Sequence, residues 1–282
     1  MSLIENFQFS QASLQDFVDC RRRFQLRYLQ HVAWPAIESE PILENERFLQ
    51  QGARFHRMIQ QHLLGVPAER LSSLALDEDL ERWWKNYLAF APQLVDKIGS
   101  EVLYPEVALT ALLGDHSLVA KCDLVVVEPE GQAIIYDWKT SRKRPKRRWL
   151  EGRLQTHVYP YLLVQAGGHL NSGEVVPPEK VEMVYWFADF PDQPERFQYS
   201  LERYQADEKY LLKLIETIGR LGEMDFPLTD DERNCRYCVY RSLCERGVEA
   251  GAFGEEEDPV LEDGAETSEF DIDFDQIAEV EF

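Results

Sequence analysis

Two short segments place acidic and basic side chains on neighbouring predicted strands. Val119-Ala-Lys-Cys-Asp123 ends on an acid, and Ile134-Ile-Tyr-Asp137-Trp-Lys139 carries an acid and a lysine two positions apart. Side chains at i and i+2 of a strand point to the same side. Two carboxylates suit Mg²⁺ or Mn²⁺, and a lysine beside them can orient water or offset charge on phosphorus. The pattern predicts metal-dependent hydrolysis of a phosphodiester. Taken alone, the triplet also fits a strand-end acid and a solvated lysine.

Six separated elements occur in order along the chain and reinforce this interpretation. They are Phe9-Ser-Gln-Ala-Ser-Leu-Gln-Asp-Phe-Val-Asp-Cys20-Arg-Arg-Arg-Phe, Gly52-x-x-x-His56, Glu106, Asp123, Asp137-x-Lys139 with Gln155-x-x-x-Tyr159, and Cys235-x-x-Cys238-x5-Cys244. From about residue 9 to residue 247, the set resembles the PD-(D/E)xK nuclease superfamily, specifically its RecB-like, CRISPR-associated exonuclease-like branch. Arg21 stands where that family often has proline. The resemblance implies an α/β restriction-endonuclease-like core, a mixed sheet flanked by helices.

Bulk properties fit a globular protein. The chain has 282 residues, of which 44% are hydrophobic, enough for one sizeable core with an appended lobe. No apolar run reaches the length of a membrane span, and the segment Met1-Ser-Leu-Ile-Glu-Asn lacks the basic and apolar regions of a secretion signal. We therefore expect a cytoplasmic protein without a membrane partner.

The net charge of -21 is unexpected for a protein that binds nucleic acid. Residues 255–282, however, hold 13 acidic residues and no Lys or Arg, which leaves 38 acidic and 30 basic residues, or -8, for the rest of the chain. The acidic segment has little apolar content, and we expect it to be disordered. It could solubilise the protein, dock on a partner, or compete with DNA for basic side chains.

Hydrophobic periodicity predicts the order of the elements. Helices are expected over residues 10–30, 43–64 and 77–98, strands over 101–112, 117–127 and 133–138, then a helix over 150–166, a strand over 180–188 and a helix over 204–222. We expect Ser10 or Ser13, and Asp77, to cap the first and third helices. The predicted regions are a helical N-terminal region (1–100) carrying Cys20 and His56, a nuclease core (101–200), a C-terminal helix with a cysteine lobe (201–250), and a disordered acidic tail (251–282).

Five cysteines raise the question of a metal site. The spacing of Cys235, Cys238 and Cys244, with Cys20 far away in the sequence, suits four-thiolate ligation. Both Zn²⁺ and an iron–sulfur cluster accept four cysteines, and ordinary buried thiols are the third possibility. The family resemblance implies a [4Fe-4S] cluster that ties the first helix to the C-terminal lobe. Cys122 is expected to be a bystander, because it neighbours Asp123 on a strand and so points to the opposite, buried face.

Four further residues are individually ambiguous. His56 on an amphipathic helix is a structural residue or, as the resemblance implies, a metal ligand beside Asp123 and Asp137. Glu106 on the first core strand could contact the metal through water, or hold Lys139 or another basic group. Gln155 and Tyr159 share one helix face. They fit a solvated glutamine and a core tyrosine, whereas the resemblance implies contact with the DNA backbone near the scissile phosphate.

A basic cluster follows Lys139 directly. We define it as Arg142, Lys143, Arg144, Lys146, Arg147 and Arg148. Such runs are often solvated, but this one lies next to the predicted site, which favours phosphate binding. Trp149 and Trp138 could stack on an unpaired base, although core packing is the favoured interpretation for either of them.

The sequence thus predicts a Mg²⁺- or Mn²⁺-dependent DNA nuclease, most simply an exonuclease on single-stranded ends in repair, recombination or phage- and CRISPR-related processing. Its catalytic group would comprise Asp123, Asp137, Lys139, Glu106, Gln155 and Tyr159. No G-x-x-x-x-G-K-[ST] loop occurs, so a helicase motor would have to be a partner chain. The alternative is a non-catalytic DNA-binding scaffold that recruits partners through its acidic tail, which would not need all of Asp123, Asp137 and Lys139.

Overall fold

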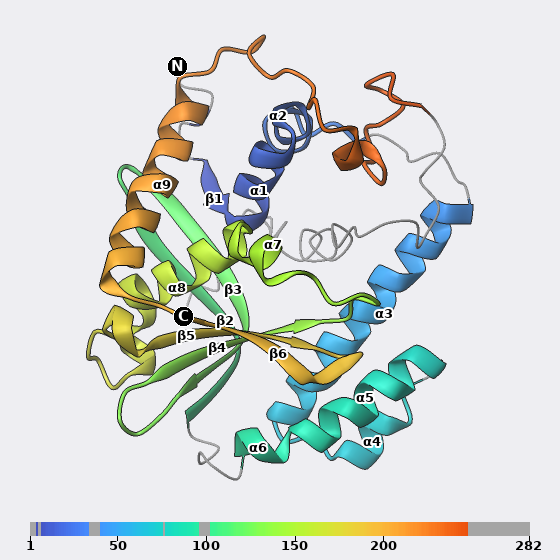
Figure 1. Ribbon diagram of the computed structural model, residues 1–282, viewed down its shortest axis with the longest axis vertical. Helices are drawn as coiled ribbons and strands as arrows, with labels where there is room; N and C mark the ends of the chain where they lie inside the picture. The colour runs from blue at the N-terminus through green and yellow to red at the C-terminus, as the bar shows by residue number, and fades with distance from the viewer. Residues whose placement is uncertain (1–3, 5–6, 34–39, 76, 96–101, 248–282) are drawn as a thin grey trace, which may run out of the picture.

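The computed structural model describes residues 4, 7–33, 40–75, 77–95 and 102–247, with the backbone alone for residues 40–45. Within these residues, a six-stranded mixed sheet forms the centre of the molecule, and helices pack on both of its faces (Figure 1). This arrangement confirms the predicted α/β class. The predicted acidic tail at 251–282 lies outside the described residues.

The sheet is organised around one long strand, β3. The strands are β1 (Gln8–Ser10), β2 (Leu103–Leu113), β3 (His116–Val127), β4 (Ala133–Lys139), β5 (Val181–Phe187) and β6 (Phe190–Gln198). β2 runs antiparallel along one edge of β3. On the other edge, β1 pairs with residues 117–119 and β4 with residues 124–127. No strand of the described part pairs with that edge over residues 120–123, so the sheet is open there.

The remaining strands extend the sheet away from this opening. β4 and β5 pair in parallel, which requires a crossover connection. It is made by α7 (Arg147–Glu151) and α8 (Leu154–Ala166). β6 pairs antiparallel with β5 and was not predicted from the sequence. It carries Pro191 and Pro194, which lack a donor for the ladder and are tolerated at a sheet edge.

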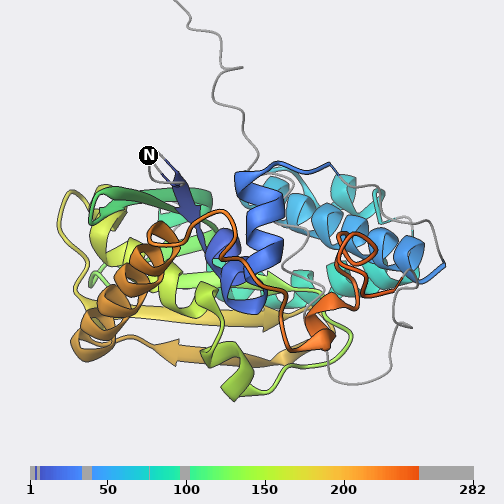
Figure 2. The ribbon, with the colours of Figure 1, turned by 90° about the horizontal axis from the view of Figure 1, so that it is seen from above.

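Two hydrophobic cores cover the two faces of the sheet. The first packs α1 (Gln11–Asp19), α8 and α9 (Leu201–Gly219) on one face. The second packs α3 (Glu40–Leu63) and α5 (Glu78–Phe90) on the other, and includes Trp83, Trp138 and Trp186. Figure 2 shows α9 and α3 at opposite sides of the molecule. Cys122 is fully buried in the first core, as predicted.

The alternation of side chains along β2 and β3 reverses at one level of the sheet. In β3, the even-numbered Leu118, Ala120 and Cys122 face the first core. Beyond Asp123 it is the odd-numbered Val125 and Val127 that face it. The reversal lies at Asp123, beside Glu106 of β2, whose backbone has φ +55°. A non-glycine residue in this left-handed region is strained, and such strain is characteristic of functional sites.

The first predicted helix is broken rather than continuous. α1 ends at Asp19, Cys20 is extended (φ -161°, ψ 107°), and α2 (Arg21–Phe24) continues as a π-helix over Gln25–Leu29. The periodicity over residues 10–30 did not reveal this break. Ser10 caps α1 as predicted, in a capping box with Ser13.

Other helix boundaries shift by a few residues. Asp77 caps α5 as predicted, but that helix ends at Phe90 and α6 (Pro92–Val95) follows, while residues 96–98 lie outside the described part. The predicted helix 150–166 is divided at Gly152 and Arg153 into α7 and α8. Shorter helices are α4 (Ala68–Ser72) and 3-10 turns at Gly167–Leu170, Pro178–Lys180 and Glu232–Cys235.

Among the described helices, none is both long enough and apolar enough to cross a lipid bilayer.

Candidate active site

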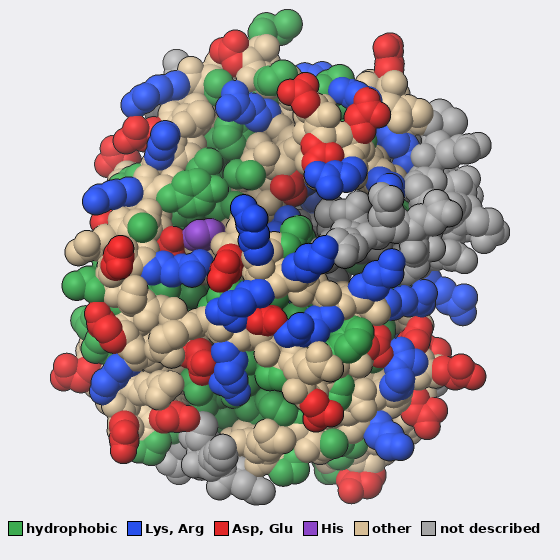
Figure 3. Space-filling view, viewed as in Figure 1, with side chains coloured by type: hydrophobic (Ala, Val, Ile, Leu, Met, Phe, Trp, Pro, Cys, Tyr) green, Lys and Arg blue, Asp and Glu red, His purple; other side chains and the backbone are tan. Residues whose placement is uncertain are grey.

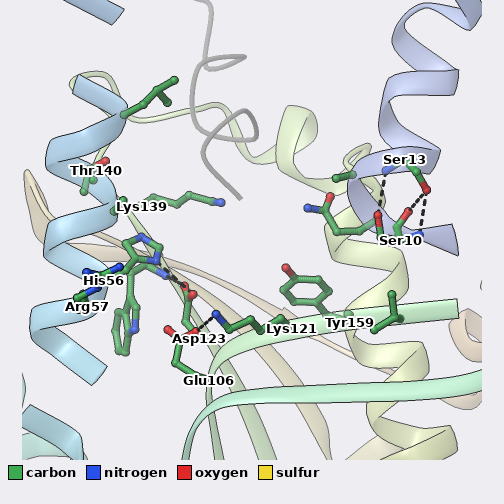
Figure 4. Close-up of a pocket in the computed structure, with 18 of the residues that line it drawn as sticks. Ser10, Ser13, His56, Arg57, Glu106, Lys121, Asp123, Lys139, Thr140 and Tyr159 are labelled. Atoms are coloured by element: carbon green, nitrogen blue, oxygen red, sulfur yellow. Dashed lines mark hydrogen bonds and ion pairs between the residues drawn. The ribbon is translucent and has the colours of Figure 1, made fainter. Parts of the chain in front are cut away.

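A cleft of about 660 Å³ opens where the sheet is unpaired. Its floor is formed by β3 and the end of β4, one wall by α3, and the other by the start of α1 and the π-helix. Figure 4 shows His56 and Arg57 entering from α3, with Asp123 and Lys139 between them and Tyr159. The cleft therefore brings together residues from elements that are far apart in the sequence.

Asp123 lies at the centre of this group. Its Oδ1 is 3.2 Å from His56 Nδ1, and its Oδ2 accepts a hydrogen bond of 2.8 Å from the backbone N–H of Trp138. The carboxylate thus bridges β3 and β4 at the level where their pairing ends. Burial opposes its ionisation, but the nearby His56, the Trp138 N–H and Lys139 together hold the pKa of Asp123 below its usual value.

Asp137 and Lys139 point to the same side of β4, as predicted. Lys139 Nζ is 3.0 Å from Asp137 Oδ2. Gln155 Nε2 donates to Asp137 Oδ1 at 2.6 Å and also lies 3.2 Å from the hydroxyl of Tyr159. Gln155 is 3% exposed, so it is not the solvated glutamine considered above. It fixes the orientation of Asp137, and Tyr159 lines the cleft.

Glu106 contacts a lysine that the sequence analysis did not select. Lys121 Nζ is 2.5 Å from Glu106 Oε2, which agrees with the expectation that Glu106 holds a basic group. Burial, and then the neighbouring Asp123 carboxylate, raise the pKa of Glu106, while Lys121 and His56 act in the opposite direction. A signal for Lys121 was present in the sequence, because it precedes Asp123 by two positions and so shares its strand face.

Gly52 sets the distance between α3 and the floor of the cleft. A Cβ atom at this position would lie 3.1 Å from Thr140 Oγ1, closer than ordinary van der Waals contact. His56 follows Gly52 by four residues and lies on the same helix face. The glycine in Gly-x-x-x-His therefore lets α3 approach the end of β4, and this approach brings the imidazole to Asp123.

The basic cluster is on the surface, and acids neutralise part of it. Arg144 and Arg147 both pair with Glu195 of β6, Arg147 at 2.8 Å. Arg142 lies 3.3 Å from Asp79 of α5. Figure 3 shows Lys and Arg side chains alternating with acids across this face. The cations lining the cleft are instead Arg27, Arg57, Lys121 and Lys139. DNA binding by the cluster stays a prediction.

The two tryptophans considered for base stacking differ. Trp138 is 1% exposed and belongs to the second core, so it is a packing residue. Trp149 is half-buried, and the guanidinium of Arg153 lies 4.8 Å from the centre of its ring. Neither ring is presented as an open stacking surface.

The C-terminal lobe contacts the broken N-terminal helix. Asn234 Nδ2 donates to the carbonyl of Asp19 at 2.9 Å, and the Tyr240 hydroxyl donates to the carbonyl of Val32 at 3.1 Å. These bonds bring the segment that contains Cys235, Cys238 and Cys244 to the segment that contains Cys20. All four thiols are free and half-buried. Protein contacts therefore join the two segments, and the predicted four-thiolate clip stays a prediction.

The cysteines and the cleft offer two different sets of donor groups for a metal ion. Burial and then Cys20 raise the pKa of Cys235 and of Cys244, and burial raises that of Cys238 to about 11. Cys20 thus influences the pKa of each of the other three thiols. Within the described residues, however, no three His, Cys, Asp or Glu side chains are already gathered as a metal site. For the cleft, the imidazole and carboxylate oxygens are a donor set suited to Mn²⁺ or Mg²⁺.

Comparisons with known proteins identify the family and the fold. The profile of the PD-(D/E)XK nuclease superfamily matches residues 8–245. A "Putative exonuclease" from Eubacterium rectale has a similar structure, with a TM-score of 0.52, 10% identity, and coverage of 89% of this chain and 91% of that one. The crystal structure of SSO0001 matches with a TM-score of 0.40, 16% identity, and coverage of 86% and 87%. No curated protein matches the sequence. The family match and the Eubacterium rectale structure confirm the restriction-endonuclease-like fold.

Proposed function

Because the chain belongs to the PD-(D/E)XK nuclease superfamily, we propose that it is a metal-dependent deoxyribonuclease that hydrolyses phosphodiester bonds of single-stranded DNA from its ends. The observation that carries this proposal is the grouping of Asp123, Asp137 and Lys139 where β3 and β4 separate. Asp123 bridges the two strands through the Trp138 N–H, and Lys139 lies 3.0 Å from Asp137. A scaffold protein would have no need for this arrangement.

Asp123, Asp137 and His56 are the residues we assign to holding Mg²⁺ or Mn²⁺. The donor chemistry fits, since two carboxylates suit either ion and an imidazole favours Mn²⁺. Glu106 lines the same cleft as Asp123 and His56, and it adds a further carboxylate beside the proposed ion. When bound, such an ion would supply Lewis-acid charge and lower the pKa of water.

Lys139 is assigned to positioning water and stabilising charge on the phosphate in the transition state. Its side chain is only 9% exposed, and its ion pair with Asp137 fixes its position. Asp137 is itself oriented by Gln155, whose Nε2 lies 2.6 Å from Oδ1. Such fixed charges need no reorganisation during the reaction, and this is the basis of electrostatic catalysis. Gln155 acts through Asp137 in this scheme and is a positioning residue.

The size of the cleft supports a single strand as substrate. A volume of about 660 Å³ falls within the range of sites that enclose a small molecule, a size that suits part of a single strand better than a duplex. The cleft is lined by Phe48, Tyr28 and Tyr159 as well as by four cations, a combination typical of proteins that bind single-stranded nucleic acid. Exonuclease action fits a cleft that takes a chain end, and a helicase is the partner class that would supply one.

For the cysteines we propose a [4Fe-4S] cluster on Cys20, Cys235, Cys238 and Cys244, with structural Zn²⁺ as the alternative. The support is that these thiols are half-buried and not in disulfides, and that the bond from Asn234 to the carbonyl of Asp19 brings the segment of Cys235, Cys238 and Cys244 to that of Cys20. A cytoplasmic location, which we also propose, would keep them reduced. The group would reinforce the contact between α1 and the C-terminal lobe, and it takes no part in the hydrolysis.

The activity is tested with a labelled single-stranded oligonucleotide incubated with Mn²⁺, with and without chelator. We expect shortening of the strand that the chelator blocks and that Asp137→Asn abolishes. A ladder from one labelled end would indicate exonuclease action and its polarity, whereas internal fragments of a circular strand would indicate an endonuclease. Binding without cleavage in both Mn²⁺ and Mg²⁺ would refute the nuclease proposal and favour the scaffold.

A further inference from the structure

Lys121 lies in the cleft beside the proposed catalytic group and has no role in it so far. It precedes Asp123 by two residues on β3, and Figure 4 shows its side chain crossing the floor of the cleft toward Glu106. It belongs to the part of β3, residues 120–123, whose one edge pairs with no described strand. A cation at this opening adjoins the path of a strand that enters the cleft.

The two lysines of the cleft differ in how accessible they are. Lys139 is 9% exposed and is held 3.0 Å from a carboxylate that is 1% exposed. Lys121 is 28% exposed, and Glu106, its partner at 2.5 Å, is 14% exposed. An ion pair open to water exchanges partners at low cost, whereas a buried one does not. Lys121 can therefore turn from Glu106 to an incoming anion, while Lys139 stays with Asp137.

Glu106 is suited to be a temporary partner. Its backbone is held at φ +55°, and it lines the cleft opposite Asp123, on the neighbouring strand β2. While Lys121 neutralises it, the cleft is less repulsive to a phosphate than its carboxylates alone would make it. A phosphate competes well for the lysine, because phosphate is a strong charge-assisted acceptor.

Resting on the proposed function, we propose that Lys121 binds the backbone phosphate next to the scissile one, and that this phosphate displaces Glu106 as the partner of the lysine. Lys121 is then a substrate-binding residue, distinct from Lys139, which acts on the reacting phosphate. The exchange links strand binding to the release of Glu106 close to Asp123.

Binding is measured without cleavage, by fluorescence anisotropy of a labelled oligothymidylate in chelator at several salt concentrations. We expect Lys121→Ala to weaken binding about 10-fold at low salt. It should also reduce the slope of log Kd against log salt by about 0.7, the value for one phosphate contact on a single strand. Lys121→Arg should keep most of the affinity. The matched control is Lys213→Ala, which removes an exposed cation of α9 outside the cleft and should leave both values unchanged.

A double-mutant cycle tests the exchange itself. Glu106→Gln frees Lys121 and should tighten binding several-fold in the wild-type background. In the Lys121→Ala background the same change should tighten binding much less, because the lysine that it frees is absent. Simple repulsion of DNA by Glu106 predicts equal gains in both backgrounds, and that result would overturn the exchange. Thermal unfolding of each variant shows whether it is folded.

The inference is wrong if Lys121→Ala binds as tightly as the wild type with an unchanged salt slope, or if the folded wild type does not bind the oligonucleotide at low salt. The proposed function is judged separately, by cleavage in Mn²⁺. A protein that cleaves but whose Lys121→Ala variant binds normally keeps the nuclease proposal and loses this one. A protein that binds through Lys121 without cleaving keeps the inference about Lys121 and loses the nuclease proposal.

Discussion

Replacing Gly52 by alanine should separate stability from activity. A Cβ at residue 52 would lie 3.1 Å from Thr140 Oγ1, a few tenths of an ångström inside ordinary contact. Relief of this contact must move α3 away from the end of β4, or move Thr140. His56 is on the same helix face one turn later, so a movement of α3 would lengthen the 3.2 Å contact between His56 and Asp123.

Two effects of Gly52→Ala on the free energy of unfolding have opposite signs, namely the higher helix propensity of alanine and the strain of the new contact. Alanine is favoured over glycine inside a helix by about 1 kcal/mol, which offsets the strain of a small displacement. We therefore expect the free energy of unfolding of Gly52→Ala to stay within about 1 kcal/mol of the wild type. Displacement of a site group by 1 Å can cost about 100-fold in rate, so a shift of a few tenths should lower kcat/KM about 10-fold.

The assay combines urea unfolding with initial rates of oligonucleotide cleavage in Mn²⁺. Thr140→Ala removes the methyl and the hydroxyl, of which the new Cβ would meet the hydroxyl oxygen, while Thr140→Ser removes the methyl alone and is the matched control. In the Thr140→Ala background, Gly52→Ala should lower kcat/KM only slightly. In the Thr140→Ser background it should lower kcat/KM by as much as it does in the wild type. An equal loss in both backgrounds, or full activity of Gly52→Ala alone, would refute the argument that this glycine sets the position of His56.

Three further outcomes are expected. Lys139→Ala should lower the cleavage rate about 100-fold or more while oligonucleotide binding in chelator changes little, and near-native rates at saturating Mn²⁺ would show that the site is assigned wrongly. Gln155→Leu should destabilise the protein by about 1–3 kcal/mol, because it leaves a buried carboxylate oxygen without its donor, and it should lower kcat more than it raises KM; a change in KM alone would argue for direct contact with DNA. Protein purified without oxygen should be brown with about four irons per chain and should lose its colour on substitution of Cys20, Cys235, Cys238 or Cys244 but not of Cys122, whereas a colourless protein with one zinc would favour the alternative.

The fold was predictable where one pattern dominated. The strands that carry Asp123 and Lys139 contain the apolar runs 124–127 and 133–136, and the caps Ser10 and Asp77 follow from their side chains. β6 was not predicted because prolines and charged residues are typical of loops. A strand can contain them here because β6 lies at the edge of the sheet. The break at Cys20 was missed because the apolar spacing continues across it, and contacts with a distant lobe hold it in place.

The candidate site was predictable in its composition but not in its connections. Spacing placed Asp137 and Lys139 on one face, and the structure places them 3.0 Å apart. It could not show that Gln155 would be buried against Asp137, since a glutamine on a helix is usually solvated. Lys121 was missed for a related reason, because its significance depends on Glu106 from another strand and on a strained backbone.

The way β1 completes the cleft has a consequence for how the protein becomes active. β1 has three residues, and it pairs with β3 across an interval of 109 residues, seen in the bond from Gln8 to Ser117. The C-terminal lobe holds the same N-terminal region from 215 residues away, through Asn234 and Asp19. Contacts between such distant segments form late in folding, because closing long loops is slow. The wall opposite α3 should therefore assemble after the sheet, and hydrogen exchange during refolding should protect α1 later than β3. A partly folded chain would then carry the acids and the lysine on its sheet without a cleft to hold DNA against them.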